Sequence, residues 1–364
     1  MKIFKKVLKI LLIVILAILL VVGGYFAYVF IAYHRLGDMD LTPTELKADA
    51  IAVGTEYKIV SYNIGFGAYE ADYGFFMDGG SESRAWSKER LDANLKNIKA
   101  LLDEQKADLY LMQEVDIDST RTYGVDERTY FNFENKASVF AQNYDSPYLF
   151  YPVTKPHGAS KSGIMTFSSF PITSAKRFEL PIEGGFRKLL DLDRCYSKSR
   201  IPTADGKELV LYNFHLSAYT ADGTIATEQL NMILADIDEE YAKGNYCIAG
   251  GDFNKDLLGD SSKYFGISGE DYSWAKPIPE GTFDGHNVRL VAPLDESKPV
   301  PSCRNADGPY TDTQFVITID GFLVTPNVTV GASNVIDVGF AYSDHNPVFM
   351  TFTLGEAQNA FPED

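Results

Sequence analysis

The feature that most constrains how this chain can fold is an uncharged run of 23 residues, Ile10 to Ala32. About 20 apolar residues are needed to cross the hydrocarbon core of a bilayer as a helix, so the run is long enough. In lipid the backbone must satisfy its own hydrogen bonds, which favours a single spanning helix. A cleaved signal peptide is the alternative, but the run is longer than a signal-peptide core and no clear A-x-A site follows it. We therefore expect a transmembrane signal anchor over residues 10–32.

The charges on either side of this run predict its orientation. Four lysines lie within residues 1–9, whereas the first charged residues of the following segment include Asp38, Asp40 and Glu45. The positive-inside rule keeps the basic N-terminus in the cytoplasm and exports the rest. We expect a single-pass protein of the cell membrane with its main domain on the extracytoplasmic side.

The remainder of the chain is organised around one large domain. Residues 33–56 are polar and irregular and are predicted to form a linker. Strand and helix signals then alternate without a break in composition over residues 57–355, and residues 356–364 are predicted to be a frayed tail. A chain of 364 residues that is 45% apolar can bury a large core.

The net charge argues against loose binding to nucleic acid. The formal net charge is −17, and residues 36–364 carry −22 because the five cations of residues 1–35 are not balanced by any acid. Nonspecific binding to nucleic acid normally needs a broad basic face. A nuclease function remains an alternative if metal ions and a local basic rim supply the attraction for nucleic acid.

The three cysteines have no metal-ligand spacing. Cys247 lies in an apolar run and is expected to be a buried small side chain. A disulfide between Cys195 and Cys303 stays open, since two cysteines alone are poor evidence.

Apolar runs of strand length alternate with helical patterns in the main domain. One helix is predicted over 89–105, with Leu91, Leu95, Ile98, Leu101 and Leu102 on one face, and a second helix is predicted over 227–244. This alternation predicts an α/β fold. The predicted strands cover residues 57–64, 107–114, 162–172, 208–220, 246–252 and 314–324, with a final strand within 339–354.

Six of these segments place an Asn, Asp, Glu or His at or near the end of a strand. Such groups are costly in a core unless they are paired or bind a cation. Each alone has a structural alternative, such as a turn former, an Asx turn, a helix cap or a satisfied core histidine. Six together indicate a shared pocket. The residues are Asn63, Glu114, His215, Asp252 with Asn254, Asp320, and Asp344 with His345.

The residue types narrow the chemistry of this pocket. Carboxylate and amide oxygens suit a hard cation such as Mg²⁺ or Mn²⁺, whereas zinc would call for more histidine or cysteine. Histidines beside carboxylates can position a water, orient a phosphate or transfer protons near neutral pH. The sequence has no G-x-S-x-G elbow and no Walker-type loop. Metal-assisted attack of water on a phosphate ester fits this inventory best.

The motifs also resemble a known family. "SYNIG", "LMQEVD", "LYNFHLSAYT", "IAGGDFN", "IDGFLV" and "YSDHNPV", in this order, are similar to those of the endonuclease/exonuclease/phosphatase superfamily. That group includes pancreatic-type deoxyribonuclease, apurinic endonucleases, neutral sphingomyelinases and inositol-polyphosphate 5-phosphatases. The resemblance covers nearly all of residues 57–355. It implies a four-layer α/β sandwich of two packed mixed sheets flanked by helices, and a Mg²⁺-dependent phosphoric ester hydrolase.

The resemblance also implies a metal site. Asn63 and Glu114 match the residues that bind the catalytic Mg²⁺, with Glu114 the principal ligand, and Asp344 matches an aspartate near the metal. Whether one or two metal ions bind stays open.

The catalytic residues follow from the same resemblance. His215 matches the histidine that contacts the phosphate. Asp252 and Asn254 match the pair that orients the nucleophile and the phosphoryl oxygens. Asp320 matches the aspartate that supports the last histidine, His345, which polarises the attacking water. Which residue acts as the general base stays open.

Candidate substrate contacts lie elsewhere in the chain. Arg194 and Arg121 are the candidates we single out, with Lys161, Arg187 and Lys188 as further cations, and a solvated surface position is the alternative for each. The segment "AYSDHNPVFM" has no lysine or arginine, which argues against a 5-phosphatase.

The substrate class itself stays open. We expect a phosphate ester, and nucleic acid, a phospholipid headgroup and a small soluble ester are all candidates. No protein partner is implied. A non-catalytic binding module is the rival hypothesis, and the presence of every core motif argues against it.

Overall fold

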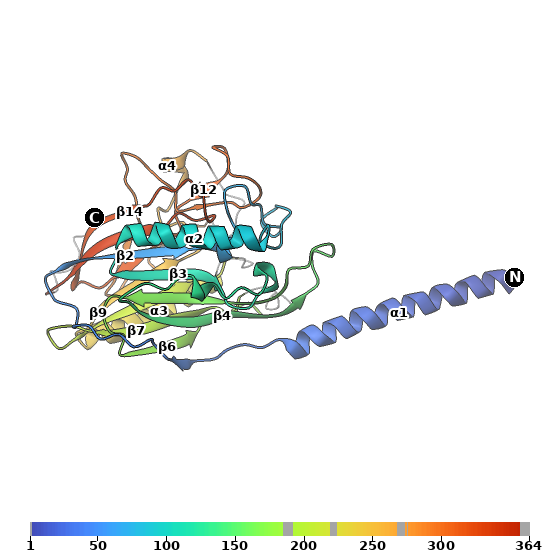
Figure 1. The fold of residues 1–364 in the computed structure, drawn as a ribbon, viewed down its shortest axis with the longest axis horizontal. Helices are drawn as coiled ribbons and strands as arrows, with labels where there is room; N and C mark the ends of the chain where they lie inside the picture. Colours follow the sequence, from blue (N-terminus) through green and yellow to red (C-terminus); the bar gives the residue numbers. More distant parts are fainter. Residues whose placement is uncertain (1, 185–191, 219–223, 268–273, 275, 357–364) are drawn as a thin grey trace.

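Two mixed β-sheets packed face to face form the centre of the molecule. The computed structural model describes residues 2–184, 192–218, 224–267, 274 and 276–356. Helix α2 (Lys88–Gln105) covers one sheet and helix α3 (Thr224–Ala242) covers the other (Figure 1). The layers therefore run helix, sheet, sheet, helix, and the predicted four-layer α/β fold is confirmed.

The first sheet has six strands, and its central strands β2 and β3 are parallel. The other neighbouring strands pair antiparallel. Its strands, in spatial order, are β14 (Val328–Val335), β15 (Val348–Leu354), β2 (Glu56–Asn63), β3 (Leu109–Asp116), β5 (Gly158–Ser168) and β4 (Ala137–Leu149).

The second sheet has seven strands, and here β8 and β9 are the parallel pair. Helix α3 is the crossover between them, as a parallel pair requires. The strands, in spatial order, are β1 (Met39–Leu41), β6 (Ser174–Glu179), β7 (Cys195–Pro202), β8 (Glu208–His215), β9 (Tyr246–Asp252), β13 (Asp320–Val324) and β10 (Arg289–Val291). A two-stranded ribbon, β11 (Cys303–Arg304) with β12 (Val316–Ile317), and the short helix α4 (Ser262–Phe265) lie outside both sheets.

Apolar side chains fill the spaces between these layers. The space between the sheets holds Ile59, Leu111, Leu211, Ile248 and Phe322, none more than 1% exposed. The predicted stripe of α2 packs on the six-stranded sheet, and this helix begins where the Ser87 hydroxyl accepts a hydrogen bond from Arg90 N. The stripe on α3 packs on the seven-stranded sheet in the same way and consists of Leu230, Ile233, Leu234 and Ile237.

Part of the segment predicted to be a linker belongs to the sheets. Strand β1 pairs with β6 at the edge of the seven-stranded sheet, and Ile51 is completely buried. Thr44 N donates to Ser138 O at 2.8 Å. An edge strand such as β6 offers free backbone groups to any extended segment, so a polar stretch can join a sheet without an apolar pattern.

Three predicted strands differ in detail from the structure, and the strand predicted over 162–172 is observed as β5, four residues earlier at both ends. The predicted strand 314–324 is split, because β12 joins the two-stranded ribbon and β13 begins separately at Asp320. Asp320 therefore starts a strand rather than interrupting one. Strand β3 does not end at Glu114 but continues to Asp116 through an irregularity between Met112 and Val115, where Glu114 takes a positive φ of 57°.

Helix α1 (Lys2–Ala32) extends away from the two sheets (Figure 1). Its most apolar stretch has a mean hydropathy of 3.0 and is entirely exposed. The helix is long and apolar enough to cross a membrane, although a signal sequence would have the same properties.

Candidate active site

The strand order brings the predicted polar residues to one edge of both sheets. In the seven-stranded sheet, Asp252 pairs in register with His215 on β8 and with Asp320 on β13. In the six-stranded sheet, Asn63 ends β2 beside the Glu114 region of β3. The loop before β15 brings His345 to the same edge, because β15 runs antiparallel to β2.

Two glycines before Asp252 allow strand β9 to pack closely against its neighbours where the two sheets meet. Gly251 has φ 149°, and a Cβ there would lie 2.0 Å from the Phe214 carbonyl oxygen. A Cβ on Gly250 would lie 2.7 Å from Phe322 and 2.9 Å from Leu111. Larger residues would therefore separate β8 from β9 or one sheet from the other.

Asn254 fixes the Asp252 side chain through a local turn. Its backbone N–H donates to Asp252 Oδ1 at 2.8 Å, and its side-chain Nδ2 donates to Leu216 O at 2.7 Å. Asn254 has a φ of 47°, which asparagine tolerates better than most residues. The Asx turn that the sequence offered as the structural alternative is therefore present.

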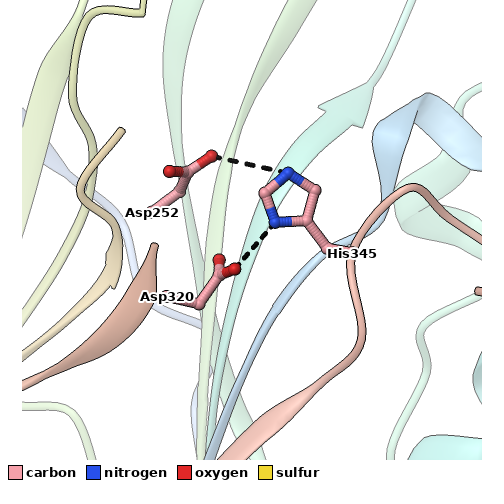
Figure 2. A group of neighbouring side chains, drawn as sticks. All are labelled: Asp252, Asp320 and His345. Atoms are coloured by element: carbon pink, nitrogen blue, oxygen red, sulfur yellow. Dashed lines mark hydrogen bonds and ion pairs between the residues drawn. The ribbon is translucent and has the colours of Figure 1, made fainter. Parts of the chain in front are cut away.

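His345 lies between two buried aspartates (Figure 2). Its Nδ1 is 2.8 Å from Asp320 Oδ2, and its Nε2 is 3.7 Å from Asp252 Oδ2. Burial alone would lower the pKa of His345, but the charge of Asp320 and their hydrogen bond outweigh it and hold that pKa well above its usual range. Asp320 can thereby orient the imidazole and stabilise its protonated form.

Both histidines of the site face the carboxylate of Asp252. His215 Nε2 lies 3.4 Å from Asp252 Oδ2, on the oxygen that also faces His345. Burial, followed by the charge of Asp320, raises the pKa of Asp252 to about 7. Burial, together with the charges of Arg194 and His345, lowers the pKa of His215 well below its usual range, which favours the neutral ring.

Asn63 links the carboxylates of the two sheets. Its Nδ2 donates to Glu114 Oε1 at 3.2 Å and to Asp252 Oδ2 at 3.1 Å, while its Oδ1 accepts from Gly65 N at 3.0 Å. The amide nitrogen thus faces the carboxylates, so Asn63 orients Glu114 in this arrangement.

Glu114 and Asp344 have the donor chemistry of a hard-cation site. Burial raises the pKa of both carboxyls, and the charge of Asp344 raises that of Glu114 further. A divalent cation would favour both ionised forms, and these oxygen donors suit Mg²⁺ or Mn²⁺. A second group, Asp252, Asp320 and His345, has ligand-type atoms within 4.8 Å of one another, but there the histidine already bonds to Asp320.

These residues surround a cavity of about 280 Å³. The predicted site residues that line it are Glu114, Arg121, Arg194, His215, Asp252, Asn254, Asp344 and His345. Asn63 and Asp320 do not line the cavity but hold residues that do, through the bonds to Glu114 and His345.

The predicted substrate cations differ in their surroundings. Arg121 makes two hydrogen bonds to Asp116, at 2.8 and 3.0 Å, and stacks over Phe66, so its charge is already paired. Arg194 is buried and donates to His215 O at 3.4 Å. Lys161 is exposed and does not line the cavity. The positions 187 and 188 lie outside the described residues.

Ser302 and Cys303 are among the residues at the site that were missed in the sequence. Ser302 Oγ donates to Asp320 Oδ2 at 2.7 Å, and Cys303 Sγ lies 3.6 Å from His345 Nε2. Both belong to a segment without a strong strand signal, and no pattern in the sequence pointed to them. Cys195 and Cys303 are free thiols, so the open question of a disulfide between them is answered in the negative.

Fold and site together define a layered α/β protein with a cavity of carboxylates and histidines at one edge of its two sheets. Residues 60–345 match the model of the Endonuclease/Exonuclease/phosphatase family, and the chain belongs to this family. The resemblance seen in the sequence is thereby confirmed. No curated protein matches the sequence.

Solved structures share this fold at low sequence identity. An endonuclease/exonuclease/phosphatase from Beutenbergia cavernae has a TM-score of 0.55 and 17% identity, over 83% of this chain and 72% of that one. ANGEL2, described as a 2',3'-cyclic phosphatase, has a TM-score of 0.55 and 16% identity, over 87% and 99%. A family member from Bacteroides vulgatus has a TM-score of 0.52 and 15% identity, over 82% and 99%. At these identities the likeness concerns the fold alone.

Proposed function

We propose that this protein is a divalent-metal-dependent hydrolase of phosphate esters, of the phosphodiesterase type. The observation that carries the proposal is the convergence of both histidines and Asn63 on the Asp252 carboxylate, at the edge shared by the two sheets. The chain belongs to a family whose description names nucleases and phosphatases, and this membership supports hydrolysis of a phosphate ester. The likeness in fold to a 2',3'-cyclic phosphatase supports the same reaction class.

Glu114 and Asp344 are the carboxylates that would hold Mg²⁺ or Mn²⁺, with Asn63 orienting Glu114. When bound, the cation would offset the charge of the phosphate and favour ionisation of water. Neutralising the charge near Glu114 would also relieve the repulsion between Glu114 and Asp344.

The remaining residues act on the water and on the phosphoryl group. Asp252 is held by the Asn254 turn and by Asn63, and it would orient the attacking water and receive its proton. His345, oriented by Asp320, and neutral His215 would donate hydrogen bonds to the phosphoryl oxygens, where negative charge develops. Asn254 supports Asp252, since its own side chain is bonded to Leu216 O.

Hydrolysis of bis-p-nitrophenyl phosphate by the full chain in detergent micelles tests this proposal. We expect turnover with Mg²⁺ or Mn²⁺, loss of turnover with EDTA and recovery when the metal is restored. Glu114→Gln and His345→Asn should each lower kcat by about 100-fold or more while the circular dichroism spectrum is unchanged.

The matched control is His286→Asn. His286 forms a similar pair with Asp238, at 2.6 Å, but does not line the cavity, so its loss should leave kcat unchanged. A folded protein without turnover of this diester under either metal would contradict the proposal and favour a non-catalytic binding module.

We also propose that the domain acts outside the cytoplasm. The lysines at the start of α1 and the acidic residues after it support an orientation with the N-terminus inside. Protease added to intact cells should then degrade the domain, whereas a domain protected until the cells are lysed would contradict this orientation.

A further inference from the structure

The loop between β4 and β5, residues 150–157, carries an exposed apolar cluster. Phe150, Tyr151 and Val153 are 53%, 66% and 68% exposed. Among the described residues outside α1, no other large apolar side chain is as exposed, and the next is Met232 at 44%. Three such side chains within four residues mark an interaction surface.

Hydrogen bonds fix this loop beside the last turns of α1. Tyr25 Oη donates to Tyr148 O at 3.2 Å and accepts from Phe150 N at 2.9 Å. Tyr28 Oη accepts from Tyr148 N at 3.1 Å. Both tyrosines lie within about 11 Å of the helix end at Ala32, at a rise of 1.5 Å per residue. If α1 spans a bilayer, the loop therefore lies at the boundary between the lipid headgroups and the acyl chains.

The connection between α1 and the domain leaves little freedom to change this placement. Six residues, 33–38, separate α1 from β1. Arg177 donates to the carbonyl oxygens of Leu36 and Gly37, at 2.8 and 2.9 Å. Arg35 donates to Leu180 O, and Asp38 accepts from Glu179 N. The domain is thus tied to the end of the helix rather than suspended from a flexible tether.

An apolar wall connects the loop to the cavity. Tyr151 and Leu149 line the cavity together with Phe76 and Met77, and the rings of Tyr151 and Phe76 lie 5.7 Å apart. The carboxylates and histidines described above line the same cavity. A cavity with this mixed lining suits a ligand that carries both a phosphate and an apolar chain.

We propose that the loop 150–157 enters the outer leaflet of the bilayer that α1 crosses, and that the cavity takes a phospholipid from this bilayer as its substrate. This inference rests on the proposed function. In the reaction the oxygen of water bonds to phosphorus, the ester P–O bond breaks, and the proton of the water reaches the departing alcohol. The acidic domain, at −22, is consistent with a substrate other than nucleic acid.

Fluorescence quenching in nanodiscs tests the membrane contact. The full chain with Phe150→Trp is placed in nanodiscs of phosphatidylcholine with or without brominated acyl chains. We expect brominated lipid to reduce the emission of the added tryptophan by about twofold, as for a side chain at the headgroup–acyl boundary. The unsubstituted chain gives the background from Trp86 and Trp274.

Met232→Trp is the matched control, since Met232 is exposed on α3 at the outer face of the seven-stranded sheet. Its emission should not respond to brominated lipid. Equal quenching at positions 150 and 232, or none at 150, would overturn the proposed contact. The emission spectrum of the tryptophan at position 150 could instead change with the number of chains per disc but not with bromination. That result would show that the apolar cluster contacts a second copy of the chain, and it would also overturn the proposed membrane contact.

Hydrolysis in vesicles tests the substrate. The double variant Phe150→Ser, Val153→Ser removes apolar side chains that do not line the cavity. In vesicles of phosphatidylcholine and phosphatidylglycerol, we expect lipid hydrolysis to fall by about tenfold, while the rate on bis-p-nitrophenyl phosphate stays unchanged.

The possible failures are distinguishable. Turnover of the soluble diester without turnover of either lipid would overturn the lipid substrate, and so would an unchanged lipid rate in the double variant. Absence of turnover of both substrates would contradict the proposed function itself. The quenching experiment decides the membrane contact in either case.

Discussion

Ser302 orients the Asp320 carboxylate that in turn orients His345. Its hydroxyl donates to Asp320 Oδ2 at 2.7 Å and accepts from the backbone N–H groups of Ile319 and Asp320, at 2.9 and 3.1 Å. The residue is completely buried, and its hydroxyl is linked to the cavity through Asp320 and His345. It is therefore a positioning residue whose loss would disturb the geometry of the histidine.

We predict that Ser302→Ala lowers kcat on bis-p-nitrophenyl phosphate by about tenfold with little change in KM, since a small displacement of a catalytic group costs rate more than binding. Steady-state kinetics and thermal unfolding should be measured on the same samples. Ser297→Ala is the control, because Ser297 makes a similar bond to Asp295 on the surface. A fall in Tm with an unchanged kcat would assign Ser302 a structural role only.

The residues of the candidate site that could be predicted from the sequence lie at the ends of regular strands. His215 and Asp252 each end an apolar run, so their polar character was visible against the pattern. Ser302 follows no such run, and its bond to Asp320 depends on how a loop crosses the sheet edge. Arg121 shows a second limit, because pairing with Asp116 cannot be read from the type of residue alone.

At the scale of elements, α3 is attached to its sheet by charges as well as by its apolar stripe. Glu240, in the last turn of the helix, is 1% exposed and bonds to Arg200 on β7 and to Asn245. Burial would raise the pKa of Glu240, but the bonds to Arg200, Lys243 and Asn245 together outweigh it and lower that pKa to about 2.

We predict that Glu240→Gln destabilises the protein by about 2 kcal/mol at neutral pH, the cost of losing hydrogen bonds to a charged group. The folded pKa lies below the usual value, so the stabilisation is present above about pH 4.5 and is lost as the pH falls toward about 2. Urea unfolding between pH 3 and 7 should show a weaker pH dependence in the variant. If the free energy of unfolding depended on pH in the same way in both proteins, the stabilising role of the Glu240 carboxylate would be contradicted.

These ion pairs explain why some strands were not predicted. Strand β7 contains Lys198 and Arg200, whose charges suggest surface positions in the sequence. In the structure Lys198 pairs with Asp236 of α3, and Arg200 pairs with Glu240 of the same helix. In contrast, α2 and β2 follow apolar periodicities and agree with the prediction to within one residue at either end. Periodicity therefore revealed the elements whose faces are apolar, and not those covered by charge pairs.

At the scale of the whole molecule, the boundary of the domain lies earlier than the sequence indicated. Residues 39–51 add an edge strand and the buried side chain of Ile51 to the sheets. We propose that the folded unit begins near Met39 rather than at residue 57.

A comparison of two fragments tests this boundary. We predict that residues 54–364 are less stable than residues 36–364 by about 3 kcal/mol, because the shorter fragment loses the burial of Ile51 and the pairing of β1. For a fragment of about 330 residues, with an unfolding entropy of about 2.1 cal/mol/K per residue, the Tm should fall by about 4–5 °C. Ile51→Ala in the longer fragment should reproduce part of the loss, and equal Tm values for the two fragments would show that the segment is dispensable.

The division of the site between two sheets links activity to the packing of the core. The six-stranded sheet supplies Asn63 and Glu114, the seven-stranded sheet supplies His215 and Asp252, and Gln113 bonds to Asn213 across the interface at 2.8 Å. A partly denatured form could keep both sheets intact and lose only the contact between them. Its far-ultraviolet spectrum would still look native, yet Asn63 would no longer reach Asp252. Turnover should therefore vanish at a lower denaturant concentration than secondary structure does, which makes the enzymatic assay the more sensitive measure of the native state.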